Sequence, residues 1–270
     1  GANDPGSFFQ DSFSVVNNIN FSGGDDKGTF NFGYTNNNSS GILPNSTLNK
    51  NNISGNFSRK LSDKWDIAAF TTFTDQSTIG RNSVGYGDNI IGNFRQWWQT
   101  NVDMQELKEE YFRNRQNVSW NMTDPLAGDF SPAYWNNPYF DRYENYQSDE
   151  HTRLLLGANL TYKITDNLNI LGRVTVDNSN DRQEYRKAIG SHPEEFGINA
   201  LDESSGYRLY TRSFLQTTYD MIANYDFTVG DFGGKALVGG TFIKSAINSF
   251  DGNTTGGLIA PGLYTLANSK

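Results

Sequence analysis

Hydrophobic and polar residues alternate most clearly along residues 154–176, LLLGANLTYKITDNLNILGRVTV. From Leu154 to Ile164 the even-numbered positions are apolar, and most odd-numbered positions are polar or glycine. The alternation restarts at Leu168, after a Thr-Asp-Asn tripeptide. Because successive side chains of a strand point to opposite faces, this stretch predicts a β-hairpin with one apolar face. That face would contact either another protein layer or membrane lipid, and in the second case the polar face would line a lumen.

The same reading of the whole chain predicts about eight strands. The fourth is less regular because Ala68 and Phe70 interrupt its polar positions, and the eighth is rich in glycine. The predicted strands cover residues 13–22, 28–36, 51–61, 65–74, 154–164, 168–176, 214–227 and 235–248. The pattern therefore indicates an all-β, antiparallel fold.

Short and long connections between these strands alternate along the chain. The short ones, at 23–27, 62–64, 165–167 and 229–234, consist of turn residues. The long ones cover 37–50, 75–150, 181–206 and the residues after about 249. Outer-membrane β-barrels show this alternation because tight turns form the periplasmic rim and longer loops form the extracellular rim. In a soluble β-sandwich there is no reason for long and short connections to alternate in this way.

The connection of residues 75–150 is the longest and is dense in aromatic residues. Connections of this size usually carry function or local structure of their own. Residues 101–114, NVDMQELKEEYFRN, predict a short helix with Asp103 near its start. The later stretch PAYWNNPYFDRYENY predicts irregular, aromatic-lined surface.

Composition narrows the choice of partners. The 270 residues carry a formal net charge of −8 with Lys and Arg scattered, so no nucleic-acid partner is expected. Mean hydropathy is −0.64, and no apolar run reaches the roughly 18 residues that a transmembrane helix needs. A barrel strand is apolar only at every second position, so low hydropathy is compatible with a barrel. Cysteine is absent, which leaves the redox compartment undecided.

No motif for catalysis or metal binding is recognisable. The GxSxG, P-loop and dinucleotide-binding patterns are missing. Residues 177–184, DNSNDRQE, space side-chain oxygens as a calcium loop does, but Arg182 stands where the sharp turn needs glycine. His151 and His192 are far apart in sequence and lack companion ligands. We therefore expect no enzyme activity, no metal and no cofactor.

Four segments resemble the SusC/RagA family of TonB-linked outer-membrane proteins, in the same order along the chain. They are FSGGDDKGTFNFGYTNNNSSGILPNS, FRQWWQTNVDMQEL, SPAYWNNPYFDRYENYQSDEHTRLLLGANLTYKITDNLNILGRV and TTGGLIAPGLYTLANS. The resemblance implies an integral β-barrel in the outer membrane of a Gram-negative cell. It further implies TonB-dependent import of oligomeric nutrients, either glycans or peptides.

The resemblance also implies what would surround this chain. Plugged barrels of this type have about 22 strands, so residues 1–270 would be one partial barrel domain of about eight strands. The plug, a first upward strand, the TonB-contacting segment and the later strands would lie outside it. The implied partners are a SusD-like surface lipoprotein that acts as a lid, the TonB complex through the missing N-terminal region, membrane lipid, and the oligosaccharide or oligopeptide.

Aromatic side chains of the long connection are the candidates for contact with the ligand or the lid. Stacking on aromatic faces together with polar hydrogen bonds suits both sugars and peptides. The alternative for each residue is packing of the loop against itself. The candidates are Trp97, Trp98, Tyr134, Trp135, Tyr139 and Tyr143.

Charged residues of the polar parity are candidates for the lumen or for contact with a plug. These are Arg153, Lys163, Arg173 and Asp177. A solvated lumen face explains them equally well. An Arg or Lys facing lipid would cost roughly 2–4 kcal/mol at the bilayer midplane, so their parity supports the assignment of the faces in either role.

Two other classes of protein remain open. The chain could be a soluble all-β extracellular module, such as a carbohydrate-binding or adhesin domain, that binds without transport, or more remotely a glycan-cleaving β-fold enzyme. The barrel hypothesis differs from both in expecting two unpaired sheet edges and aggregation when this segment is expressed alone.

Overall fold

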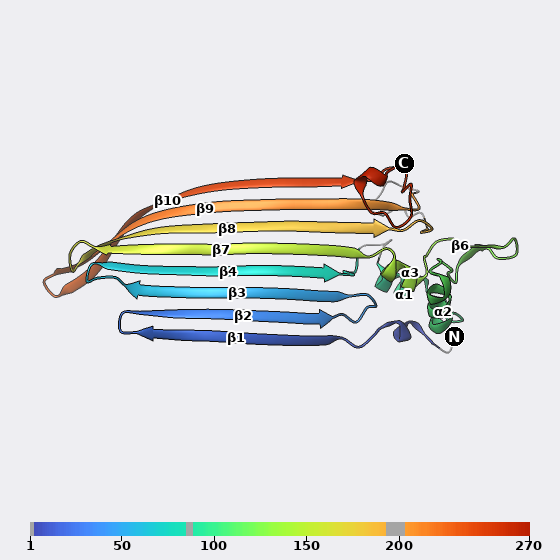
Figure 1. Ribbon diagram of the computed structural model, residues 1–270, viewed down its shortest axis with the longest axis horizontal. Helices are drawn as coiled ribbons and strands as arrows, with labels where there is room; N and C mark the ends of the chain where they lie inside the picture. The colour runs from blue at the N-terminus through green and yellow to red at the C-terminus, as the bar shows by residue number, and fades with distance from the viewer. Residues whose placement is uncertain (1–2, 85–88, 193–202) are drawn as a thin grey trace.

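A computed structural model describes residues 3–84, 89–192 and 203–270. Its main element is an eight-stranded antiparallel sheet in the order β1-β2-β3-β4-β7-β8-β9-β10 (Figure 1). The strands are β1 (Phe13–Asp25), β2 (Gly28–Ser40), β3 (Thr47–Lys60), β4 (Trp65–Ile79), β7 (Gln147–Lys163), β8 (Leu168–Lys187), β9 (Gly206–Val229) and β10 (Phe232–Asn253). The predicted all-β, antiparallel fold is confirmed, and the sheet has the up-and-down order of a barrel wall.

The strands are longer than the alternation predicted. The connection predicted at 37–50 is wrong for most of its length, because Asn37 pairs with Lys50 and Asn38 pairs with Asn49. Asn and Ser occupy both faces there, so no hydrophobic alternation marks the strands. The connections at 80–146 and 188–205 remain long. Short and long connections therefore still alternate.

Tight turns close the four hairpins at one end of the sheet. In the first, the Asp25 carboxylate accepts a hydrogen bond from the Lys27 N–H at 3.0 Å. In the hairpin of residues 154–176, the Ile164 N–H donates to the Leu168 carbonyl at 2.9 Å. Gly230 adopts a φ of 61° in the last turn, a conformation that glycine adopts without steric penalty.

The other elements gather at the opposite end of the sheet. They are η1 (Pro5–Phe8), α1 (Ile90–Trp97), α2 (Met104–Asn114), β5 (Met122–Asp124), β6 (Asp129–Pro132), α3 (Pro138–Tyr143) and η2 (Leu266–Asn268). The predicted helix at 101–114 is confirmed as α2, and the Asp103 carboxylate caps it by accepting from the Gln105 N–H at 2.9 Å. The prediction of irregular structure around 132–146 is wrong at α3, where Asn137 is the N-cap and Pro138 the first helical residue. None of the described helices is long and apolar enough to cross a bilayer.

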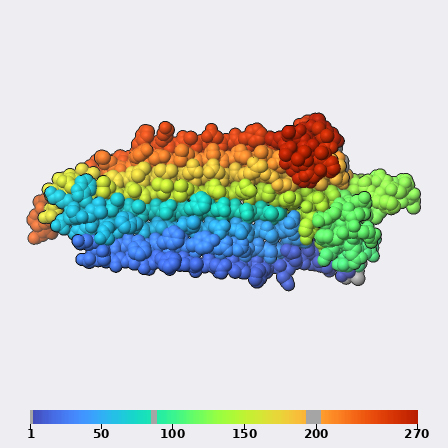
Figure 2. Space-filling view, viewed as in Figure 1, coloured from blue at the N-terminus to red at the C-terminus, as the bar shows by residue number. Residues whose placement is uncertain are grey.

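The hydrophobic core lies at this end and not against the sheet. We call η1, α1, α2, the β5–β6 hairpin and α3 the loop unit. Its most buried side chains, Met104 and Tyr111, are 0% exposed. Phe8 and Tyr139 complete the centre of this core, which also contains Leu43, Ile90, Leu107, Phe140 and Ala188. The β5–β6 hairpin projects furthest from the sheet (Figure 2).

The register gives the sheet two chemically different faces. We call the face that carries Leu154 and Val174 the apolar face. One line of paired residues across it reads Phe30, Phe57, Ala69, Ala158, Val174, Tyr219 and Phe242. Phe30 is 52% exposed and Phe242 is 63% exposed, so no other layer of the described chain covers this face.

A polar line crosses the apolar face nearer the loop unit. It consists of Asn17, Asn36, Asn51, Asp75, Thr152, Asn180, Ser213 and Asn248. Most apolar side chains of this face lie between the line and the short turns, although Phe13 and Val15 of β1, Ile79 of β4, Leu209 of β9 and Phe250 of β10 lie beyond it. The apolar face is therefore a band of limited height.

The opposite face, which we call the polar face, is mostly hydrophilic over β1 to β8, whereas β10 exposes Leu237, Ile243 and Ile247 on it. One line across six strands reads Asn18, Thr35, Asn52, Thr74, Arg153 and Ser179. Side-chain hydrogen bonds follow this line, such as Asn18 Nδ2 to Thr35 Oγ1 at 2.6 Å and Thr74 Oγ1 to Asn52 Oδ1 at 2.9 Å. Both faces are exposed to water in the isolated chain, but only the polar face has the side chains to be hydrated.

Candidate functional site

Three of the six aromatic candidates pack inside the loop unit. Tyr139 is 4% exposed, and its ring lies 5.0 Å from that of Phe8. Tyr143 stacks on Tyr111 at 5.7 Å. Burial raises the pKa of Tyr139 to about 12, so its hydroxyl stays neutral.

Trp98 makes similar contacts at the edge of the same core. Its ring lies 5.5 Å from Phe94 and 5.0 Å from Trp120. In this structure Trp98, Tyr139 and Tyr143 therefore hold the loop unit together. Side chains packed in this way offer little surface to a ligand or lid, so their contact with either stays a prediction.

The other three candidates form an exposed group, which we call the aromatic ledge. Trp97, the last residue of α1, and Trp135 stack with ring centroids 6.1 Å apart and planes at 27°. Trp97 is 45% exposed and the neighbouring Tyr134 is 69% exposed. The structure thus brings Trp97 and Trp135 together, with the exposed Tyr134 next to Trp135 in the chain, and offers aromatic faces of the kind that stack on planar or ring-shaped ligands.

Two asparagines hold the ledge in place. The Asn121 side-chain oxygen accepts from the backbone N–H groups of Tyr134 and Trp135, both at 2.8 Å. The Asn137 amide, which is 0% exposed, donates to the carbonyls of Leu107 and Val118, also at 2.8 Å. Sequence reasoning missed both residues, and the Asn-Pro pair at 137–138 was the only local signal of a helix start.

Arg142 joins the loop unit to the sheet. It is 5% exposed, and its guanidinium donates to the carbonyls of Pro44 at 2.8 Å and of Gly80. In return the Asn45 amide donates to the Arg142 carbonyl at 2.8 Å. Burial lowers the pKa of Arg142. One side chain of α3 thereby ties together the 41–46 connection and the end of β4.

The four charged candidates lie on the polar face, each within reach of an opposite charge of the sheet. The Arg153 guanidinium binds both Asp177 carboxylate oxygens, at 2.9 and 2.7 Å. Arg173 binds Asp220 at 2.7 Å, and Lys163 lies 3.1 Å from Asp66. These pairs are cross-strand contacts within the wall. Contact of the four candidates with a plug stays a prediction.

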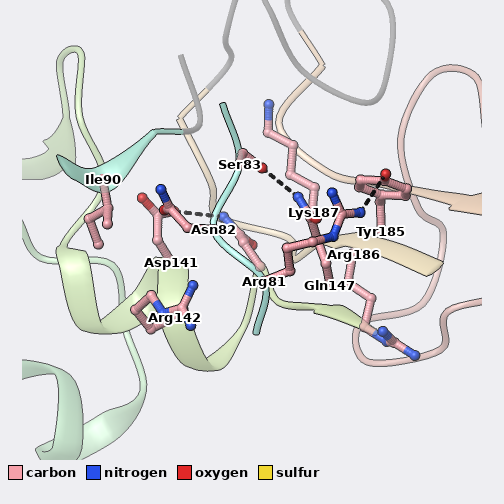
Figure 3. Close-up of a pocket in the computed structure, with 11 residues that line it drawn as sticks. Arg81, Asn82, Ser83, Ile90, Asp141, Arg142, Gln147, Tyr185, Arg186 and Lys187 are labelled. Atoms are coloured by element: carbon pink, nitrogen blue, oxygen red, sulfur yellow. Dashed lines mark hydrogen bonds between the residues drawn. The ribbon is translucent and has the colours of Figure 1, made fainter. Parts of the chain in front are cut away.

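A pocket lies where the loop unit meets the strand ends (Figure 3). Its walls come from the segment after β4, from α3 and from the ends of β7 and β8. Arg81, Asn82, Ser83, Ile90, Asp141, Arg142, Asn145, Gln147, Tyr185, Arg186 and Lys187 line it. Sequence reasoning did not bring these residues together, because they come from four separate segments.

The described residues contain no group of three or more His, Asp or Glu side chains placed to hold a metal ion. His151 instead lies 2.6 Å from Asp181 on the polar face. The His192 ring is 6.4 Å from Tyr134, beside the aromatic ledge.

The comparisons with known proteins place the chain by fold. No model of a protein family matches it, and no curated protein matches its sequence. By class the chain is an all-β, antiparallel sheet of the barrel-wall kind.

Similar solved structures include chains of the RagAB peptide importer. In its closed-closed state the match has 15% identity and a TM-score of 0.66, and covers 95% of this chain and 27% of that one. A structure of the RagAB peptide transporter gives 14% and 0.63, with 95% and 27% covered. The open-open state gives 14% and 0.63, with 97% and 27% covered. The likeness establishes the fold, and this chain spans about a quarter of the length of those chains.

Proposed function

We propose that the chain is part of the wall of a TonB-dependent outer-membrane importer of the SusC/RagA kind. One observation carries the proposal. Strands β1 to β9 carry most of their exposed apolar side chains on one face, largely within a band that ends at a polar line, whereas β10 also exposes Leu237, Ile243 and Ile247 on the other face. A lipid-facing barrel wall has this alternation, because its outer side chains meet hydrocarbon and its inner ones meet water. The likeness to RagAB importer chains supports the same class.

The direction of the wall follows from its connections. The four tight turns belong in the periplasm, and the loop unit belongs outside the cell. The polar face, with Arg153, Lys163, Arg173 and Asp177, lines the lumen. A plug and the remaining strands, contributed by the rest of the parent protein, complete the barrel, and the TonB complex moves the plug.

The proposed substrate is an oligomeric nutrient, either a peptide or a glycan. The neighbouring structures are of a peptide importer, which favours a peptide. A SusD-like lipoprotein closes over the loop unit as a lid. The aromatic ledge of Trp97, Tyr134 and Trp135 contacts the substrate or the lid at the barrel mouth.

Substitution at the ledge tests this proposal in the full-length importer. Trp97→Ala or Trp135→Ala removes one partner of the stack, and we expect binding of the oligomer or lid to weaken about tenfold, as the loss of one aromatic stacking contact does. Calorimetric titration of the purified importer with candidate oligomers and with its lipoprotein measures the effect.

Phe130→Ala is the matched control, since Phe130 is 52% exposed on the β5–β6 hairpin and outside the ledge. Equal loss in the control and ledge variants, or no loss in either, contradicts the role given to the ledge. Recovery of the full-length protein in the aqueous phase of a detergent extraction contradicts the importer itself and favours a soluble all-β binding module.

A further inference from the structure

Strand β10, at one edge of the sheet, departs from the alternation of the other strands (Figure 1). Its residues 236–247, ALVGGTFIKSAI, contain three pairs of adjacent apolar residues, at 237–238, 242–243 and 246–247. Because successive side chains of a strand point to opposite faces, each pair puts one apolar side chain on the apolar face and one on the polar face. Two apolar faces are typical of a strand that is covered on both sides.

On the polar face, these side chains and two from β9 form what we call the inner stripe. It consists of Phe214, Ile222, Leu237, Ile243 and Ile247. The three residues of β10 are between 57% and 69% exposed, so nothing in the described chain covers them. The register places Phe214 opposite Ile247. Ile222 lies over Gly239, since an added Cβ at that glycine would stand 3.1 Å from the Ile222 Cγ1 atom.

The inner stripe is long and uncharged. The ten residue steps from Leu237 to Ile247 span about 33 Å of strand, comparable with the roughly 30 Å thickness of the hydrocarbon core of a bilayer. Between Lys235 and Asp251, every β10 residue with the parity of the polar face is uncharged. On β7 and β8 the same face carries ion pairs such as that of Arg153 with Asp177. The wall therefore has one apolar lane beside a hydrophilic remainder.

The position of the inner stripe limits what can cover it. Membrane lipid and a second copy of the chain both approach a closed wall from outside, where the apolar face lies. A substrate is present only in passing, whereas an exposed apolar surface of this extent needs cover in the resting state as well. What remains is another part of the same polypeptide. In a chain as long as the matched RagAB chains most of the residues lie outside this segment, which covers 27% of such a chain.

We propose that the inner stripe is the surface on which the plug of the parent protein packs, through apolar contacts. Beside β9 and β10, the side chains of plug and wall exclude water. Over β1 to β8 the wall is hydrophilic, and cations such as Arg153 and Lys163 already have carboxylate partners within it. The inference rests on the proposed import function and adds where, and by which chemistry, the plug is held.

Cysteine accessibility tests this contact in the full-length importer with its other cysteines removed. Ile243→Cys places a thiol in the inner stripe, and Asn31→Cys is the matched control at the same height of the polar face on β2. One line of paired residues joins the two positions, through Asn56, Phe70, Gly157, Thr175 and Thr218.

In purified importer without substrate, a small water-soluble maleimide should label position 31 at least about tenfold faster than position 243. A thiol that is covered in about nine molecules of ten reacts about tenfold more slowly than an open one. Urea at a concentration that releases the plug, but leaves the heat-modifiable mobility of the folded barrel, should remove the difference.

A charge in the inner stripe provides a second measurement. Ile243→Asp should loosen the plug and raise the ion conductance of the importer in planar bilayers at least about tenfold, because a carboxylate replaces a buried apolar side chain. Asn31→Asp adds the same charge to the hydrophilic part of the wall and should leave the conductance low. Ile243→Val keeps the apolar contact and should also leave it low.

Equal labelling of positions 31 and 243 in the folded importer overturns the proposal, as does equal conductance of the two aspartate variants. Fast labelling of position 243 that slows only when an oligomer is added assigns the inner stripe to the substrate, and also overturns it. These outcomes leave the import function standing, since uptake by cells that carry the unsubstituted protein tests that function separately.

Discussion

Gly80, at the end of β4, shows how single residues fix the loop unit to the sheet. Its φ is 72°, and an added Cβ would stand 1.8 Å from the Asn45 carbonyl oxygen. Its own carbonyl accepts a hydrogen bond from Arg142. A side chain at this position would therefore oppose both the local backbone conformation and the contact between β4 and the 41–46 connection.

Gly80→Ala should detach the loop unit from the strand ends. The left-handed conformation alone costs a residue with a Cβ about 1–2 kcal/mol, and the clash with Asn45 adds to that. Limited proteolysis of the 80–146 connection measures the change. Gly128→Ala is the control, because Gly128 has a φ of 82° with nothing within 4 Å of its Cβ position. Equal protease sensitivity of the two variants would show that the contact with Asn45 is unimportant.

His192 gives the ledge region a dependence on pH. Burial lowers the pKa of His192 below its usual value of 6.5. The unfolded loop therefore binds the proton more readily than the folded one, so stability falls as pH drops below about 6.5. The protection of residues 131–137 against hydrogen exchange, after correction for the intrinsic pH dependence of the exchange rate, should be lower at pH 5 than at pH 7.

The control for this pH effect is a variant that lacks the imidazole of His192. His192→Gln removes the ring and should make the protection of residues 131–137 against exchange less dependent on pH. An unchanged pH response in that variant would assign the effect to another group.

At the scale of the element, consecutive residues of β8 alternate between the apolar face and the polar face, which would contact lipid and lumen in the proposed barrel wall. Val174→Arg places a cation in the middle of the apolar face, and we expect it to destabilise the inserted barrel by about 2–4 kcal/mol. Thr175→Arg adds the same charge to the polar face, where water solvates it. The heat-modifiable mobility of the full-length barrel in gel electrophoresis measures folding of each variant. Equal tolerance of the two substitutions would contradict the assignment of the faces.

The strands could be predicted from sequence because apolar and polar residues alternate along most of them. The signal holds for each strand independently of its neighbours, so even the glycine-rich β10 was found within residues 235–248. It fails where a strand is polar on both faces. The extensions of β2 and β3 through Asn37, Asn38 and Asn49 depend on pairing with neighbouring strands.

The loop unit was less predictable because its structure depends on contacts distant in sequence. α2 could be predicted from sequence because it has an Asp103 cap and amphipathic spacing. α3 is held by Asn137 and Arg142, whose partners lie on other segments. The six aromatic candidates look alike in sequence. Their division into a buried group with Tyr139 and an exposed ledge with Trp97 follows only from how the helices pack.

At the scale of the whole molecule, the sheet has open edges. β1 and β10 each pair with one strand in the described part of the chain, and the apolar face lacks a cover. Unpaired strand edges recruit other strands. The segment alone is therefore expected to aggregate in water, and closure by further strands of a parent protein would satisfy both edges.

Topology in intact cells tests the central claim most directly. The chain has no cysteine, so single cysteines can replace Leu126, which is 100% exposed on the β5–β6 hairpin, and Asp166 in a short turn. In cells that express the full-length protein with its other cysteines removed, a membrane-impermeant maleimide should label position 126 at once. It should label position 166 only after the outer membrane is permeabilised. Labelling of both positions in intact cells, or of neither, would contradict a wall that crosses the outer membrane with its loop unit outside.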